Sequence, residues 1–273
     1  MMINETLLRL VPPILRAREF RLYTRDGRRL VDLWQHGGAA ILGRSSGGLL
    51  RVLKNSAQRC LFTPLPHPQE GRFLKALSAL LPGMDFRLYR GDTALRRAFG
   101  TDSFPDPALF PDMPLPPAPI LWRPFLDGII SPDRPLIPVL PLPWPVPLRV
   151  LALPPALRET TAGIPASQLI SPVTLAAATR GVYDLIAATP ARGRVIYPRI
   201  EEALAEKKWL RRGIYLYLGP DLDDEAYGGV FTRFLEQGFL LPPARDIPLI
   251  LPGILSPGEE TKLSGLLREN FSP

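Results

Sequence analysis

The sequence predicts an α/β fold, in which short strands alternate with amphipathic helices. Several segments carry apolar residues at three- and four-residue spacing and are preceded or followed by short apolar runs typical of strands. Capping and turn residues mark where these segments begin and end. The composition, 46% apolar and 22% charged, is that of a globular protein, and 273 residues suffice for one large domain or two small ones.

The N-terminal part predicts a hairpin followed by a glycine-rich loop. The run FRLYTRDGRRLVDLW, Phe20 to Trp34, indicates two strands joined at Asp26-Gly27, a pair that favours a type I′ turn. A glycine-rich passage runs from His36 to Gly48, and a helix-like apolar segment from Leu49 to Leu61 follows it. Because no GxxxxGK[ST] motif is present, we interpret the passage as a flexible loop.

Two helices and a strand are expected before residue 100. The spacing of Phe73, Leu74, Leu77, Leu80 and Leu81 predicts a helix over 69–81, which Pro82-Gly83 ends. The run DFRLYRG predicts a short strand that turns at Gly91 into a second helix, TALRRAFG.

The stretch from Pro105 to Pro155 has a different character. It holds 17 of the 34 prolines, so long helices and central strands are disfavoured there. The same stretch is rich in leucine, isoleucine and valine, whereas disordered proline-rich linkers are polar. We therefore expect extended, edge-like segments packed against a core, with SH3-type recognition of its PxxP spacings as a minor alternative.

Regular patterning returns after Gly163. Ser171-Pro172 opens a helix that we expect to stop at Pro190, and IEEALAEKKWL predicts another before the strand GIYLYL. Tyr227, Val230, Phe231, Phe234 and Leu235 share one face of a further helix that ends at Gly238. The runs FLLPP and IPLILPGIL predict short strands, and Ser256 with Glu259 forms a capping box before the last helix.

Charge and cysteine usage limit the classes of function. The net charge is +7, but the arginines occur in pairs at most, so binding to a nucleic acid or scaffold is the less favoured alternative. The lone Cys60 excludes an intramolecular disulfide, fits a reducing, cytoplasmic compartment and has no histidine at a zinc-ligand spacing. The N-terminus does not have the pattern of a signal peptide, and no long uncharged, proline-free run predicts a membrane span. A Ser-His-Asp hydrolase is not supported, because no GxSxG elbow is present.

Four segments, in the same order, resemble parts of the class III aminotransferases. These enzymes belong to the pyridoxal-phosphate (PLP) fold type I group, and glutamate-1-semialdehyde aminomutase is the member that the chain resembles most. RDGRRLVDLWQHGGAAILGR (25–44) resembles the family's opening hairpin and glycine segment, with Arg44 where the family has histidine. DFRLYRGDTALRRAF (85–99) resembles the strand, turn and helix that seat the cofactor phosphate. SPVTLAAATRGVYDLIA (171–187) and the run 227–263 resemble later elements, including the small domain.

The resemblance implies a reduced PLP-transferase fold type I, in which the hairpin and the C-terminal segment form an α+β small domain. It divides the chain into residues 1–100, a proline-rich shortened core over 101–165, and a C-terminal segment over 166–273. The turn Gly91, Asp92 and Thr93 then stands where the cofactor phosphate binds in the family. Asp92 places a carboxylate there, which opposes binding of another anion.

The family's catalytic residues have no counterpart, because no lysine lies between Lys75 and Lys207 to form the Schiff base. Arginine cannot replace it, since its guanidinium stays protonated. The aromatic residue that stacks on the cofactor ring is missing. Asp127 is the one loose candidate for holding the pyridine nitrogen, but the pair Asp127-Gly128 is more typical of a turn. We therefore expect a degenerate, non-catalytic relative with no catalytic residue, no metal and no bound cofactor, acting in binding or assembly.

Two alternatives remain open. The first is a PLP-dependent aminotransferase or aminomutase with a relocated lysine, for which Lys54, Lys75, Lys207 and Lys208 are the candidates. The second is the arginine-rich binding protein for a nucleic acid or scaffold. For a partner, the resemblance implies either a homodimer or a complex with a complete aminotransferase.

Overall fold

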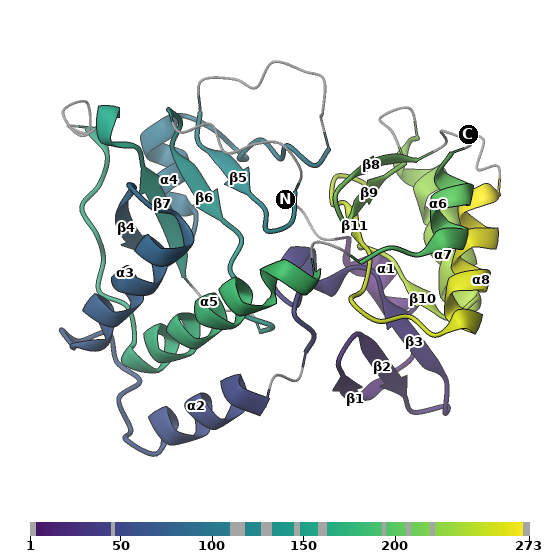
Figure 1. Ribbon diagram of the computed structural model, residues 1–273, viewed down its shortest axis with the longest axis horizontal. Coiled ribbons are helices and arrows are strands. Elements are labelled where there is room, and N and C mark those ends of the chain that lie inside the picture. Colours follow the sequence, from purple (N-terminus) through teal and green to yellow (C-terminus); the bar gives the residue numbers. More distant parts are fainter. Residues whose placement is uncertain are drawn as a thin grey trace. The chain divides into compact units, whose positions relative to one another are not determined.

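The computed structural model describes residues 4–44, 47–109, 118–126, 133–144, 148–157, 163–192, 195–205, 209–218 and 222–269 (Figure 1). The chain forms two compact units. The first unit contains residues 1–45, 125–127 and 189–273, and the second contains 46–124 and 128–188. The sequence-based division at residues 100 and 165 follows the resemblance, whereas these units are defined by contacts within the folded chain.

The first unit contains a four-stranded sheet in the order β1-β2-β3-β10. Its strands are β1 (Ile14–Arg18), β2 (Arg21–Thr24), β3 (Arg29–Asp32) and β10 (Phe239–Leu240). The first three pair antiparallel, and β10 adds to β3 in parallel. The short helix α1 (Glu5–Arg9), capped by Asn4, and the turn η1 (Gln35–Gly38) flank these strands in the sequence.

The predicted hairpin is confirmed as β2 and β3, but its turn is not of type I′. That type requires positive φ at both central residues. Gly27 has φ +83°, whereas Asp26 does not have a positive φ, and its carboxylate instead accepts a hydrogen bond from the Thr24 hydroxyl. Strand β1, which directly follows Pro12 and Pro13, was not predicted.

A second sheet of the first unit has the order β11-β9-β8 and is antiparallel. Its strands are β8 (Leu210–Arg212), β9 (Tyr215–Tyr217) and β11 (Leu249–Ile250), accompanied by the helices α6 (Pro198–Leu204), α7 (Asp224–Glu236) and α8 (Pro257–Arg268). The predicted buried face of α7 and the capping box of α8 are both confirmed. The prediction that the helix before this sheet extends to Leu210 is wrong at its C-terminal end, because Leu210 begins β8.

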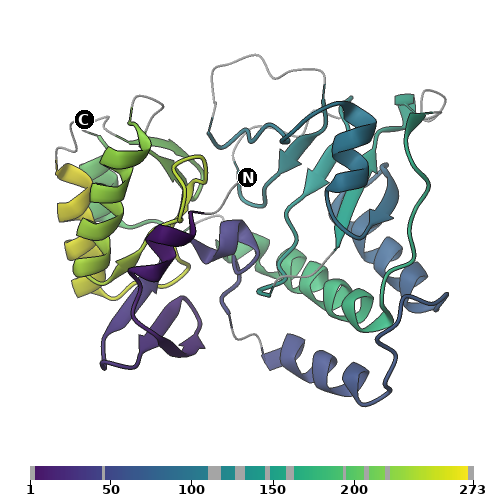
Figure 2. The same ribbon diagram turned by 180° about the vertical axis from the view of Figure 1, so that it is seen from behind.

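The second unit is a sheet covered by helices on both faces. Its strands are β4 (Asp85–Tyr89), β5 (Ile120–Trp122), β6 (Leu136–Pro138) and β7 (Arg149–Leu153), in the order β4-β7-β6-β5. The helices are α2 (Gly47–Ala57), α3 (Gln69–Leu80), α4 (Thr93–Phe99) and most of α5 (Pro172–Arg192). Figures 1 and 2 show α3 and α5 on one side of the sheet and α4 on the other.

Alternating side chains of the strands supply these two layers. Leu88 of β4 and Val150 of β7 pack with Phe73 and Leu77 of α3 and with the apolar face of α5. The neighbouring side chains Tyr89 and Leu151 point to the opposite layer, where Leu95 of α4 is buried. The period of two along each strand therefore holds the strands between the helices.

The structure corrects two expectations about proline. The proline-rich stretch supplies β5, β6 and β7, and β6 and β7 are interior strands rather than edges. Pro138 lies in β6 opposite Trp122, at the end of that strand, where a missing N–H interrupts the sheet least. Helix α5 continues past Pro190 to Arg192, because a proline in the last turn removes only one backbone hydrogen bond. Pro155–Leu157 forms the short turn η2.

Within the described part of the chain, no helix is both long and apolar enough to cross a bilayer.

Candidate functional site

The turn between β4 and α4 contains the residues that the sequence analysis singled out. Gly91 has φ +133°, a backbone conformation that favours glycine, and it ends the strand sharply. Arg90, which precedes it, and Thr93, which opens α4, are exposed. The turn is therefore fixed by one glycine and leaves polar side chains facing solvent.

An extended segment, Ile164–Gln168, fastens the end of β4. The Gln168 N–H donates to the Leu88 carbonyl at 2.8 Å, and the Leu88 N–H donates to the Ser167 hydroxyl at 3.0 Å. The Arg90 N–H donates to Gln168 Oε1 at 2.9 Å. Because Oε1 accepts from this N–H, the free end of the Gln168 amide is its NH₂ group, a hydrogen-bond donor.

A hollow of about 250 Å³ opens beside the turn, and we call it the arginine hollow. It is lined by Arg90, Gly91, Thr93, Ala94, Arg97 and Gln168. Among the residues that the structure describes, neither Arg90 nor Arg97 has a carboxylate partner. The lining thus combines two unpaired guanidinium groups with a hydroxyl and an amide donor and contains no acidic side chain.

Asp92 belongs to the turn but does not line the arginine hollow. Arg149 Nε lies 2.5 Å from Asp92 Oδ1, and Arg96 Nη2 lies 3.4 Å from its Oδ2. Two cations therefore compensate the carboxylate that we expected to oppose an anion. Of the three predicted phosphate-turn residues, Gly91 and Thr93 come together in the lining and Asp92 is held apart.

The described residues fit a phosphate group better than they fit covalently bound PLP. Lys75 on α3 and Lys54 on α2 are exposed to solvent and do not line the arginine hollow. Lys207, Lys208 and Asp127 lie outside the described residues. Arginines can bind the phosphate of such a cofactor, but the lining offers no amine for an imine bond.

Arg44 and His67 have structural roles. Arg44, which stands where the family has histidine, forms an ion pair with the buried Asp32 at 2.7 Å. His67 accepts a hydrogen bond at Nδ1 from the N–H of Gln69, the first residue of α3. The described residues hold no cluster of three or more His, Cys, Asp or Glu side chains that could bind a metal ion.

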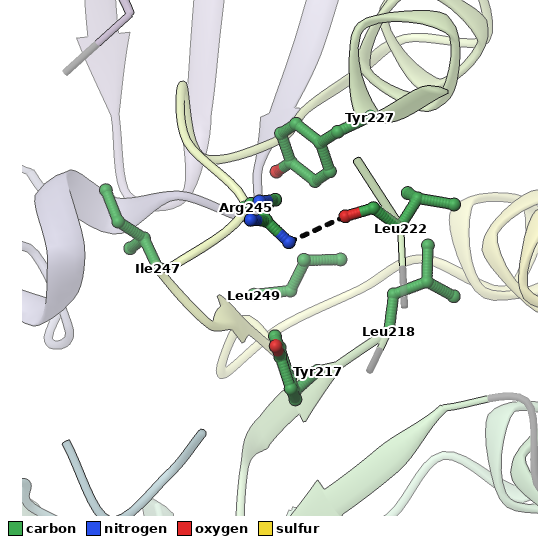
Figure 3. Close-up of a pocket in the computed structure, with 7 residues that line it drawn as sticks. All are labelled: Tyr217, Leu218, Leu222, Tyr227, Arg245, Ile247 and Leu249. Carbon is green, nitrogen blue, oxygen red and sulfur yellow. Dashed lines mark hydrogen bonds between the residues drawn. The ribbon is translucent and has the colours of Figure 1, made fainter. Parts of the chain in front are cut away.

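A second cavity lies in the first unit and is too small for a ligand (Figure 3). Its volume is about 10 Å³, and a cavity of roughly that size holds one water molecule. Arg245, one of the lining residues, donates to the Leu222 carbonyl at 2.7 Å, and the Tyr227 hydroxyl donates to the Pro242 carbonyl. Burial raises the pKa of Tyr227, so its hydroxyl stays protonated. These contacts stabilise the unit and offer no binding site.

Arg90, Arg97 and Gln168 were not predicted as site residues. Thr93 and Arg97 are four residues apart, so they share a face of α4, and this spacing could have identified Arg97. Arg90 directly precedes the turn glycine. Nothing in the sequence places Gln168, 78 residues away from Arg90, beside the turn.

No known family profile matches the sequence. An uncharacterized protein of Treponema pallidum is 26% identical over 286 aligned residues, which cover 87% of this chain and 88% of that protein. The two chains are covered to nearly the same extent, so their lengths are similar. An uncharacterized protein of Borreliella burgdorferi is 39% identical over 64 residues, 23% of this chain and 24% of that protein.

Solved aminotransferase structures resemble the chain over almost its whole length. Ornithine δ-aminotransferase of Plasmodium falciparum has a TM-score of 0.66 at 10% identity, covering 94% of this chain and 92% of that chain. Acetylornithine aminotransferase of Elizabethkingia anophelis has a TM-score of 0.64 at 11% identity, covering 98% of both. An omega-transaminase of Sphaerobacter thermophilus has a TM-score of 0.62 at 12% identity, covering 94% and 90%. The expected resemblance is confirmed: the chain has the mixed α/β fold of the class III aminotransferases.

Proposed function

We propose that this chain uses the aminotransferase fold without Schiff-base chemistry and binds a small, phosphate-bearing anion in the arginine hollow. The observation that carries the proposal is the unpaired state of Arg90 and Arg97 beside Gly91. Guanidinium groups bind phosphate through two parallel, charge-assisted hydrogen bonds. The Thr93 hydroxyl and the Gln168 NH₂ group supply further donors on the same lining.

The lining also favours an acceptor-only ligand. Gln168 Oε1 already accepts from the Arg90 N–H, and the Asp92 carboxylate is held by Arg149. A ligand that must donate hydrogen bonds finds fewer partners here than a phosphate, whose oxygens accept them. The volume of about 250 Å³ suits a phosphate ester of a small molecule rather than a polymer.

The proposed loss of catalysis depends on lysine. In a PLP enzyme, a lysine amine holds the cofactor covalently. The sequence has none between Lys75 and Lys207, and Lys75 is exposed on α3. The relative in Treponema pallidum has a similar length, which supports a stable short form of the fold rather than a peculiarity of this chain.

Isothermal titration with inorganic phosphate, and separately with PLP, tests the proposed site. We expect Arg97→Gln to weaken phosphate binding by about tenfold, since a hydrogen bond to a charged group contributes about 1.5 to 3 kcal/mol. Arg51→Gln is the matched control, because Arg51 is an exposed arginine on α2 of the same unit and does not line the hollow. Equal weakening in both variants, or in neither, would contradict the proposed site.

A further inference from the structure

Strand β1 is the uncovered edge of the sheet β1-β2-β3-β10. All five of its residues are exposed, including Ile14 at 40% and Leu15 at 69%. On its other side β1 pairs with β2, and within the described residues no strand covers its free edge. An open edge of this kind carries main-chain groups that can pair with another strand.

The hairpin register identifies which groups of β1 are free. The two-residue loop Glu19–Phe20 closes on the pair Arg18 and Arg21, and Ala17 lies opposite Leu22. Hydrogen-bonded and non-hydrogen-bonded pairs alternate in an antiparallel ladder, and a two-residue loop closes on a bonded pair. The N–H and C=O groups of Ala17 therefore face away from β2. A bulge between Ile14 and Arg16 ends the regular ladder, so the free edge is short.

The charges on this edge are all positive. Residues 6–18 contain Arg9, Arg16 and Arg18 and no acidic residue. The Arg16 guanidinium lies 4.3 Å from the centre of the Tyr23 ring, which orders it and leaves its N–H donors available. Among the described residues, neither Arg16 nor Arg18 has a carboxylate partner.

The neighbouring strand cannot supply the missing negative charge. Arg18 lies opposite Arg21, whose guanidinium lies 2.7 Å from Glu259 Oε2 and 3.6 Å from Glu19 Oε2. Arg21 of β2 therefore engages both of these acidic residues. The free edge presents main-chain groups, an exposed leucine and two arginines that are not neutralised.

We propose that β1 is a docking edge for an extended acidic segment of a partner protein. The segment adds as a further strand beside Ala17, its carboxylates pair with Arg16 and Arg18, and an apolar side chain covers Leu15. A second copy of this chain fits poorly, because pairing two β1 strands brings four arginines onto one ribbon. The same charges keep the edge from pairing with itself while they admit an acidic strand.

The test uses short labelled peptides and the full chain. Fluorescence anisotropy compares a peptide of alternating valine and glutamate with one of alternating valine and lysine. We expect the glutamate peptide to bind and the lysine peptide to bind at least about tenfold more weakly. The double variant Arg16→Glu, Arg18→Glu should reverse this preference. The control double variant Arg51→Glu, Arg59→Glu, which changes exposed arginines of the second unit, should keep it.

A main-chain variant separates strand addition from simple charge attraction. Ala17→Pro removes an N–H that faces away from β2, so it should abolish peptide binding and leave the hairpin folded. Ala17→Val keeps the N–H and should retain binding. Binding that survives Ala17→Pro in a folded protein would overturn strand addition. If the wild-type chain dimerises and Ala17→Pro abolishes the dimer, the choice of partner is overturned. If Ala17→Pro fails to fold, the charge-reversal variant tests the proposal independently.

Discussion

Arg149 Nε lies 2.5 Å from Asp92 Oδ1, and this ion pair separates the one acidic side chain of the β4–α4 turn from the arginine hollow. Arg149 stands at the start of β7, opposite Tyr89, the last residue of β4. The sheet register therefore places the cation beside the turn. From the sequence we expected the Asp92 carboxylate to oppose anion binding. In the structure this carboxylate has two arginine partners.

Removing this carboxylate should strengthen anion binding. In Asp92→Asn the negative charge near the hollow is lost, and Arg96 and Arg149 are left without their partner. We expect phosphate to bind about three- to tenfold more tightly, a change of roughly 1 kcal/mol. Titration calorimetry at low salt measures it. Weaker binding in a variant that remains folded would show that Asp92 supports the site through its ion pairs.

Gly91 should be required for the shape of the turn. Its φ of +133° is strained for any L side chain, although a Cβ atom would meet no neighbour within 4 Å. Gly91→Ala should therefore lower the free energy of unfolding by about 1 to 3 kcal/mol through backbone strain alone. The control is Gly71→Ala within α3, which also meets no neighbour and should raise stability by about 1 kcal/mol. Urea unfolding measures both, and equal effects would contradict the strain.

Stability should fall in acid through the ion pair of Glu259 with Arg21. Burial raises the pKa of Glu259, but hydrogen bonds from Arg21 and from the Ser256 N–H lower it by more, so its pKa lies below the ordinary value. The folded state therefore favours the carboxylate. This contribution is complete above the unfolded-state pKa of about 4.3 and is lost as pH falls through the lower folded-state pKa.

Glu259→Gln removes that contribution. We expect a loss of about 2 kcal/mol at pH 7 and a flatter pH dependence below pH 5, measured by thermal unfolding. Glu269→Gln is the control, because Glu269 forms an exposed pair with Arg233 and should change stability little. The same acid sensitivity in wild type and Glu259→Gln would rule out this source of the pH dependence.

Close packing at Gly181 gives a test of the second unit. A Cβ atom at this position of α5 would lie 2.9 Å from the Pro141 carbonyl oxygen, so the helix and the proline-rich segment must separate. We expect Gly181→Ala to cost about 1 to 3 kcal/mol. Gly265→Ala in α8 meets nothing within 4 Å and should be neutral or stabilising. A neutral Gly181→Ala would mean that the segment around Pro141 yields easily.

The sequence predicted those elements that depend on residues a few positions apart. The face of α7 that contains Phe231 and Phe234 follows from helical spacing, and the capping box at Ser256 follows from two residues three positions apart. The expectations at Pro138 and Pro190 were wrong, because the effect of a proline depends on whether a backbone N–H at that position would have had a hydrogen-bond partner. At the end of a strand or in the last helical turn, it removes little.

The candidate site could be predicted only in part for the same reason. Gly91 and Thr93 could be predicted because they lie in sequence between β4 and α4 or at the start of α4. Gln168 reaches Arg90 through an extended segment, and Arg149 reaches Asp92 through strand pairing. These contacts join residues 78 and 57 positions apart. No spacing rule relates such pairs.

The most direct test of the proposed function is to add PLP to the purified chain, reduce with borohydride and locate any adduct by mass spectrometry. We expect PLP to bind reversibly, inorganic phosphate to displace it, and reduction to leave no stoichiometric adduct on a lysine. A single lysine modified in full, at Lys54, Lys75, Lys207 or Lys208, together with an aldimine absorbance that reduction removes, would contradict it and identify a PLP enzyme with a relocated lysine.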